Sequence, residues 1–139
     1  MTDMKMVEEI SVGNDDNPCR VLVVDDDKPM RGLLKALVES LGAVVVGEAE
    51  DGEEAVRIYG ECIPDLTFLD IQMPVKNGMD ALKEIIKKDP TATVIMLTAT
   101  SDMAVADSCV NAGARTFIRK AAAPNVLRAM VKMQLDSLG

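Results

Sequence analysis

The sequence predicts an α/β domain in which a five-stranded parallel sheet is covered by helices on both faces. Five short runs of mostly apolar residues, rich in valine and isoleucine, recur along the chain, and each precedes a segment with apolar residues at helical spacing. Strands of this kind, separated by helical crossovers, form buried parallel sheets. The chain has 139 residues, of which 48% are hydrophobic, and this is enough for one domain with one core.

Five strands are expected, and all but the last are apolar on both faces. In chain order they span residues 20–24, 43–46, 65–69, 93–97 and 116–118. The last run is shorter and more polar, so we expect it at an edge of the sheet.

The helix after each strand begins at a capping residue, a glycine or a proline, and each of the first four ends at a glycine or a proline, as the chemistry of helix ends favours. The starting signals, in chain order, are Asp27 with Pro29, Asp51 with Glu54, Gly78 after a turn at residues 73–78, Ser101 with Asp102, and Pro124. The ending signals are Gly42, Pro64, Pro90 and Gly113. Right-handed crossovers leave two common orders for an open sheet, and five strands favour the order 2-1-3-4-5.

In that order the first and third strands lie side by side where the winding of the chain reverses, and ligands bind beyond the carboxyl ends of the strands there. Asp25 and Asp26 directly follow the first strand, and Asp70 follows the third. Three carboxylates in one place repel one another unless a cation neutralises them, and their hard oxygen atoms suit Mg²⁺. We therefore expect Mg²⁺ as the cofactor, held by these acids.

Two further side chains reach the same edge of the sheet. Thr98 ends the fourth strand with a hydroxyl, and Lys120 ends the fifth with an ammonium group. With the metal bound, these residues lack only an anion, and a phosphoryl group would supply it. Lys120 would neutralise its charge and Thr98 would donate a hydrogen bond. Asp70, alone on its strand, is the natural nucleophile because a carboxylate can accept a phosphoryl group as an acyl phosphate.

The composition excludes several classes of function. The chain contains no histidine, which removes Ser–His–Asp and Cys–His catalysis, histidine metal sites and any phosphohistidine of its own. The formal net charge of −8 and the lack of a basic run argue against binding to nucleic acid. No stretch reaches the roughly 18 apolar residues of a membrane span, so we expect no membrane association.

The domain is expected to span residues 19–139, after a flexible acidic arm at residues 1–18. We expect no output domain after the last helix. The arm lacks the basic and apolar segments of a signal peptide. The cysteines lie far apart without a Cys-x-x-Cys pair, so free thiols in the cytoplasm are expected; they are Cys19, Cys62 and Cys109.

Five motifs in order along residues 20–138 resemble those of the receiver domain of two-component response regulators. The layout is similar to that of the free-standing, chemotaxis-type receivers, and it implies their flavodoxin-like, doubly wound (βα)5 fold. Each motif is weak alone, but the set at these separations is specific. The motifs are Val23-Val24-Asp25-Asp26, Leu69-Asp70-Ile71-Gln72-Met73-Pro74, Asn77-Gly78, Leu97-Thr98-Ala99 and Phe117-Ile118-Arg119-Lys120.

The resemblance implies a role for each residue at the strand ends. Asp70 would be the phosphoacceptor, and Lys120 would pair with the phosphoryl group. Asp26, Asp70 and the main-chain carbonyl of Gln72 would bind Mg²⁺. Asp25 would act on the metal directly or through water.

The resemblance also implies a switch. Thr98 would move toward the phosphoryl oxygen, and Phe117 would rotate inward behind it. These movements would couple the site to the surface formed by the fourth helix, the fifth strand and the last helix, which carries the output in the family. Gln72 and Thr100, two residues past Asp70 and Thr98, would set the lifetime of the phosphoryl group.

Two positions depart from the usual pattern of the family. Phe117 stands where a tyrosine is often found, so coupling by packing is retained without a hydroxyl. Ala121 stands where a proline usually follows the lysine, and a cis bond before alanine costs about 2.5–4 kcal/mol, so we predict a trans Lys120–Ala121 bond. The alanines at residues 121–123 either leave a small apolar patch on the output surface or begin the last helix early.

The predicted function is a phosphorylation-dependent signalling switch rather than an enzyme. The phosphoryl group would come from a phosphohistidine on a sensor histidine kinase or a histidine phosphotransfer protein, or from a small donor such as acetyl phosphate. The output would pass to an unidentified protein target. One alternative is a receiver-shaped binding module that does not use phosphorylation. Another is an aspartate-nucleophile phosphohydrolase, which needs acids that are absent between Lys120 and Asp136.

Overall fold

The computed structural model describes residues 17–99 and 103–138 of the chain. Its five parallel strands form one sheet in the order β2-β1-β3-β4-β5, which confirms the predicted order. The strands are β1 (Arg20–Val24), β2 (Val44–Ala49), β3 (Leu66–Asp70), β4 (Val94–Thr98) and β5 (Thr116–Arg119). The helices that alternate with them are α3 (Lys28–Ser40), α4 (Gly52–Cys62), α5 (Gly78–Lys88), α6 (Met103–Asn111) and α7 (Pro124–Asp136).

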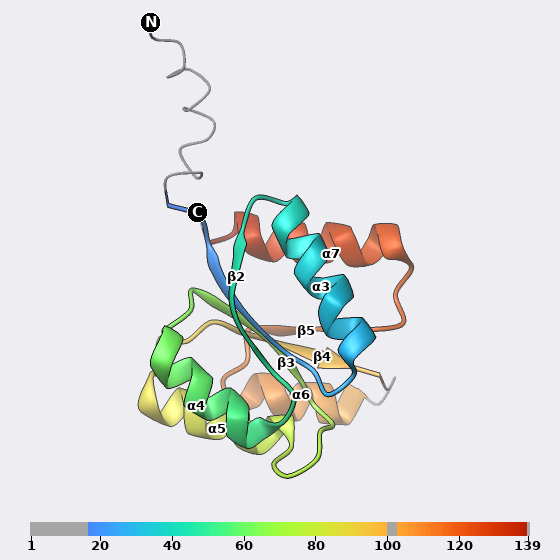
Figure 1. Ribbon diagram of the computed structural model, residues 1–139. Helices are drawn as coiled ribbons and strands as arrows, with labels where there is room; N and C mark the ends of the chain where they lie inside the picture. Colours follow the sequence, from blue (N-terminus) through green and yellow to red (C-terminus); the bar gives the residue numbers. More distant parts are fainter. Residues whose placement is uncertain (1–16, 100–102, 139) are drawn as a thin grey trace, which may run out of the picture.

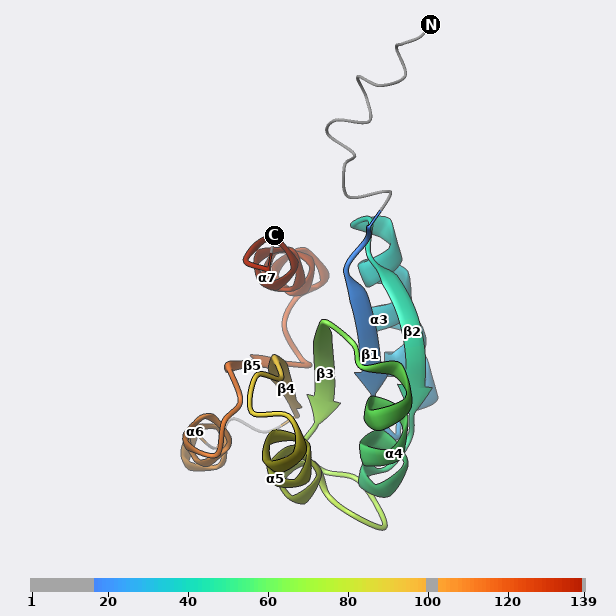
Figure 2. The ribbon, with the colours of Figure 1, turned by 90° about the vertical axis from the view of Figure 1, so that its left-hand side faces the viewer.

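The helices form a layer on each face of the sheet. Figures 1 and 2 show α3 and α7 on one face and α4, α5 and α6 on the other. Consecutive residues of a strand point to opposite faces, so the central strands contribute to two apolar cores. Val23 and Phe68 lie in the core beneath α3 and α7, whereas Val24 and Leu69 lie in the core beneath the other three helices. This burial on both faces explains the unbroken apolar runs in the sequence.

The predicted boundaries agree with the structure to within about two residues, except at the second strand. β2 continues to Ala49, three residues beyond the predicted end at residue 46, and pairs with β1 up to Val24. The extension includes the polar Glu48 and passes through Gly47, because an edge strand can be half solvated and needs no continuous apolar run. A Cβ at Gly47 would press on the side chain of Ile58 in α4, which explains the glycine.

Two predicted helix caps have different outcomes. The capping arrangement at α4 is confirmed: Asp51 accepts a hydrogen bond from the N–H of Glu54 at 2.8 Å, and Glu54 in turn accepts one from the N–H of Glu50 at 2.9 Å. Asp27 occupies the cap position of α3 but its side chain makes no capping hydrogen bond. The first turn of α3 contains Pro29, which has no N–H to satisfy.

The sequence spacing predicts that the apolar face of the fourth helix consists of Val105, Cys109 and Val110, and this prediction is partly wrong. Val110 is 39% exposed, and the buried residues of α6 are Ala106 and Cys109. Residues three apart share one face of a helix, so when Cys109 points inward its neighbour Val110 is turned about 100° away. The predicted cap residues Ser101 and Asp102 lie outside the described residues.

No helix in the described part of the chain is long and apolar enough to cross a membrane.

Candidate functional site

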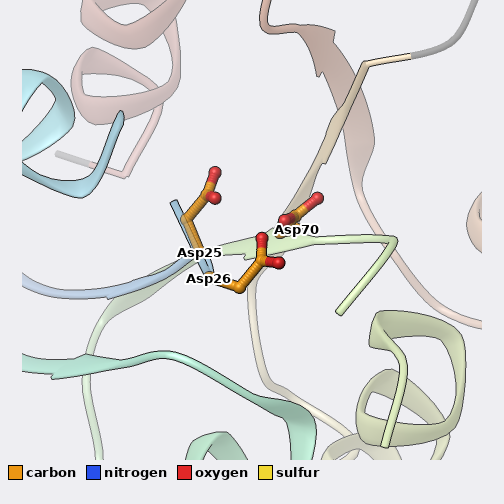
Figure 3. A group of neighbouring side chains, drawn as sticks. All are labelled: Asp25, Asp26 and Asp70. Carbon is orange, nitrogen blue, oxygen red and sulfur yellow. The ribbon is translucent and has the colours of Figure 1, made fainter. Parts of the chain in front are cut away.

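The three strand-end acids meet at one edge of the sheet. Asp25 directly follows β1, Asp70 ends β3, and the two strands pair up to Val24 and Leu69. One carboxylate oxygen from each of Asp25, Asp26 and Asp70 lies within 4.8 Å of the others. Figure 3 shows the three side chains grouped at this edge. Asp25 is 0% exposed and Asp70 is 2% exposed, whereas Asp26 faces solvent. The predicted convergence of the acids is therefore present in the structure.

Lys120 supplies the positive charge between the two buried acids. It directly follows β5, and its Nζ lies 2.8 Å from Asp25 Oδ2 and 3.0 Å from Asp70 Oδ2. The N–H of Lys120 donates to the carbonyl of Thr98 at 2.9 Å, so the pairing of β4 with β5 continues through the lysine. Thr98 ends β4 and is 3% exposed. The structure thus brings together the five predicted residues Asp25, Asp26, Asp70, Thr98 and Lys120.

In each of the two buried acids, the carboxylate oxygen that does not pair with Lys120 accepts a main-chain hydrogen bond. Asp25 Oδ1 accepts a hydrogen bond from the N–H of Asp27 at 2.9 Å, and Asp70 Oδ1 accepts a longer one from the N–H of Gln72 at 3.3 Å. The start of α5 lies close to the end of β3. The N–H of Gly78 donates to the carbonyl of Ile71, the residue after Asp70, at 2.7 Å. A Cβ at Gly78 would overlap the main-chain oxygen of Asp70, so this close approach requires glycine.

The pKa values of Asp70 and Lys120 shift in the same direction for different reasons. Burial raises the pKa of Asp70 to about 7, and the charge of Asp25 adds to this, although the Lys120 ammonium works in the opposite direction. Burial alone would lower the pKa of Lys120, but the carboxylates of Asp25 and Asp70 outweigh it and raise this pKa above its ordinary value. Lys120 is therefore a permanent cation, whereas Asp70 is an acid whose charge is costly without a further positive charge.

The site has the donor set of a Mg²⁺ site. Three carboxylates supply hard oxygen ligands from two adjacent strand ends. Within the described residues, Asp25 Oδ2 and Asp70 Oδ2 are buried and have no hydrogen-bond partner beyond their ion pairs with Lys120. One ammonium shared by these acids leaves negative charge that a divalent cation would neutralise. The acids present therefore fit the expected cofactor.

The structure tests two predictions about the loop after Lys120, the trans Lys120–Ala121 bond and the start of the last helix. The described residues contain no cis peptide bond, so the Lys120–Ala121 bond is trans, as predicted. The last helix begins only at Pro124, so the alternative that the alanines start it early is wrong. Proline has no N–H and its fixed φ suits the first helical position, which explains the late start. Ala121 and Ala123 are exposed in this loop.

The remaining predicted residues lie near the site or beyond the described part of the chain. Phe117 is half-buried on β5, where it pairs in register with Met96 and packs against the core beneath α4, α5 and α6. The side chain of Gln72 is exposed. Thr100 lies outside the described residues.

Arg31 is a residue of this region that the sequence pattern does not single out. Its Nη1 donates to the main-chain carbonyl of Asp25 at 2.8 Å. A spacing of one helical turn after Asp27 is the signal that could indicate it, because residues at the start of α3 lie above the end of β1.

A comparison with known proteins identifies the family. Residues 21–132 match the model of the response regulator receiver domain. The chain belongs to this family. The receiver is 44% identical over 115 residues to the chemotaxis protein CheY of Thermotoga maritima, which covers 82% of the receiver and 96% of that protein. It is also 46% identical over 101 residues to Protein CcdB of Bacillus subtilis. That alignment covers 73% of this chain and 84% of CcdB.

Solved structures agree with this assignment. One chain of the crystal structure of the CheX–CheY–BeF3–Mg²⁺ complex from Borrelia burgdorferi matches the receiver with a TM-score of 0.77 and 34% identity. The match covers 84% of the receiver and 90% of that chain. The receiver is accordingly a phosphorylation-switched signalling protein, a phosphoacceptor rather than a catalytic enzyme, and its phosphodonor is a histidine kinase. The phosphohydrolase alternative has no support from these comparisons.

We predict that the metal-free receiver loses stability through Asp70 as the pH rises between about 4 and about 7. In this interval the unfolded chain has released the Asp70 proton, whereas the folded protein retains it because its pKa is raised from 3.8 to about 7. Ionisation in the folded state therefore destabilises it. In metal-free urea unfolding, Asp70→Asn should become more stable than the wild type by on the order of 2 kcal/mol near pH 7, and by little near pH 4.

The matched control is Asp27→Asn, which changes an exposed acid next to the site. Its stability should follow the wild type across the same pH range. If the Asp70→Asn curve also runs parallel to the wild type, burial does not raise the Asp70 pKa.

Proposed function

We propose that this receiver is a switch in which Asp70 accepts a phosphoryl group with the help of Mg²⁺, Lys120 and Thr98. The observation that carries the proposal is the pairing of one ammonium with two buried carboxylates, Asp25 and Asp70, beside the exposed Asp26. A nucleophile, a fixed cation and metal ligands are thus combined at one sheet edge. Phosphoryl transfer depends mainly on positioning and on the neutralisation of charge, which such a site provides.

The donor is a phosphohistidine on a sensor histidine kinase or on a histidine phosphotransfer protein. An oxygen of the Asp70 carboxylate forms a bond to phosphorus while the bond from phosphorus to the imidazole nitrogen breaks. The products are the acyl phosphate of Asp70 and the free histidine of the donor. The Lys120 ammonium, already 3.0 Å from Asp70 Oδ2, pairs with the transferred group, and the Thr98 hydroxyl donates to one of its oxygens.

Asp26, Asp70 and the main-chain carbonyl of Gln72 would hold Mg²⁺, and Asp25 would act on the metal directly or through water. When bound, Mg²⁺ neutralises negative charge on the carboxylates and on the phosphoryl oxygens. The Borrelia burgdorferi complex supports this assignment, because it combines a CheY with BeF3 and Mg²⁺.

The signal leaves through the surface formed by α6, β5 and α7. Thr98 and Phe117 lie on the neighbouring strands β4 and β5, so a movement of the threonine toward the phosphoryl group opens space into which Phe117 rotates. Phe117 has no hydroxyl, so this coupling acts through packing alone. Figure 2 shows α6 and α7 on opposite faces of the sheet, near the edge formed by β5.

The output passes to another protein. The Borrelia burgdorferi complex contains CheX together with CheY, so a relative of this receiver assembles with a protein partner. We propose a cytoplasmic setting of the chemotaxis type for this chain, with residues 19–139 as the receiver. Residues 1–16 of the predicted arm lie outside the described residues. The lack of histidine places every phosphohistidine on the partner.

Asp70→Asn should abolish labelling by a radioactive phosphohistidine donor in the presence of Mg²⁺, because the amide cannot form an acyl phosphate. Asp27→Asn is the matched control and should be labelled like the wild type, since its side chain is exposed. Label that persists in Asp70→Asn would place the acceptor elsewhere. A wild type that takes up no label from any donor would favour a binding module that does not use phosphorylation.

Changing Gln72 and Thr100 together to alanine should alter the lifetime of the acyl phosphate by several-fold without preventing its formation. Both residues lie two positions beyond a strand-end residue of the site, where they guide or obstruct the attacking water. The measurement is the loss of label from the purified phosphoprotein over time. An unchanged rate in the double variant would refute this role.

Beryllofluoride with Mg²⁺ should allow the receiver to retain a protein partner that it does not retain without the mimic. Met103→Asp should prevent this, because Met103 is 45% exposed on α6 and its sulfur lies 3.5 Å from Arg119 on β5. Leu33→Asp, an equally exposed position on α3, should leave retention unchanged. The readout is affinity capture followed by quantitative mass spectrometry. Retention that is independent of the mimic, or lost equally in both variants, would contradict the proposed surface.

A further inference from the structure

Arg31 links the metal site to two other elements of the fold. It lies in the first turns of α3, and its side chain is 14% exposed. Its Nη1 donates to the main-chain carbonyl of Asp25 at 2.8 Å, and its Nε lies 3.5 Å from Glu48 Oε1 on β2. One guanidinium therefore contacts the peptide that follows β1 and a side chain of the neighbouring strand.

The carbonyl that Arg31 contacts belongs to the peptide between Asp25 and Asp26. The paired registers of β1 with β3 end at Val24, so this carbonyl lies just past the last paired residue. The other polar groups of Asp25 are also held: its N–H donates to the carbonyl of Ala49 at 3.1 Å, and its Oδ1 accepts from Asp27 at 2.9 Å. Arg31 completes the set of contacts that fixes this peptide.

The orientation of this peptide decides where the Asp26 carboxylate lies. Asp26 is exposed, and neither burial nor strand pairing restrains its side chain. In Figure 3 its carboxylate nevertheless points toward Asp70, and the two belong to the same group of potential ligand atoms. If the peptide group between Asp25 and Asp26 were not held, the Asp26 carboxylate could turn toward solvent. Its negative charge favours this in the absence of metal.

Glu48 holds the guanidinium from the other side. Its second oxygen lies 3.6 Å from Lys35, so the glutamate pairs with two cations of α3. Ion pairs between groups exposed to this degree contribute little to stability. Within the described residues, Lys35 forms an ion pair with Glu48 and none with Asp25 or Asp70. The planar fork of arginine can contact a carbonyl and a carboxylate at once, which lysine cannot do as well.

We propose that Arg31 is a positioning residue for the Mg²⁺ site, acting through the Asp25–Asp26 peptide. This inference rests on the proposed role of the acids as metal ligands. Groups that hold the ligands of a metal in place typically change metal affinity by about 10- to 100-fold when they are removed. Arg31→Met retains much of the apolar stem and removes both polar contacts.

The test is calorimetric titration of the full chain with Mg²⁺ alone, at one pH and ionic strength, without any phosphodonor. Arg31→Met should bind Mg²⁺ about 10-fold more weakly than the wild type. Lys35→Met is the matched control, since it removes the same charge and the other partner of Glu48, and its affinity should be unchanged. Arg31→Lys should recover part of the loss, because an ammonium can still donate to the Asp25 carbonyl.

Thermal unfolding in the absence of metal shows whether each variant is folded. Arg31→Lys carries the test if Arg31→Met does not fold: its affinity should then lie measurably below that of the wild type. Equal Mg²⁺ affinity in the folded Arg31 variants and the wild type would overturn the positioning role, and so would an equal loss in Lys35→Met. Failure of the wild type itself to bind Mg²⁺ is a different result, which would overturn the proposed metal site.

Discussion

The ion pairs of Lys120 with Asp25 and Asp70 are the constraint on which the rest of the structure depends. Two carboxylates with almost no exposure lie at adjacent strand ends, and each keeps an oxygen that only this ammonium neutralises among the described residues. Removing Lys120 would be far more destabilising than removing a surface ion pair, because two buried carboxylates would be left without compensation. The fold itself must therefore place Lys120 next to these acids.

The order of the strands in the sheet places Lys120 beside Asp25 and Asp70. Placing β3 between β1 and β4 makes Asp25 and Asp70 neighbours, and β5 then lies two strands away from β3. Only a long side chain can cross that distance, and Lys120 does so from the end of the edge strand while its N–H remains paired with β4. The two apolar cores hold the three central strands in this order. Stability supplied by those cores offsets the cost of concentrating acids at one edge, a local conflict of the kind found at functional sites.

The site could be predicted from the sequence because its chemistry lies at strand ends. An apolar run fixes where a strand ends, and a parallel sheet brings such ends to one edge, so Asp25, Asp70 and Thr98 follow from the pattern alone. The contact of Arg31 could not be predicted in this way. It is made to a main-chain carbonyl, and a sequence pattern records side-chain types rather than the direction of a peptide. The prediction that Val110 belongs to the apolar face of α6 failed for a related reason, since hydrophobicity alone does not fix the rotation of a weakly amphipathic helix.

The loop after Lys120 separates the chemistry of the site from its output. A proline usually follows the lysine in receivers, and its replacement by Ala121 raises the question of what keeps the ammonium in place. The structure answers it with the main chain: the N–H of Lys120 donates to Thr98, so the lysine is held by the β4–β5 ladder rather than by the loop. Ala121 and Ala123 are exposed beside the start of α7, so the departure from the family pattern changes an exposed loop while the ion pairs of Lys120 with Asp25 and Asp70 remain in place.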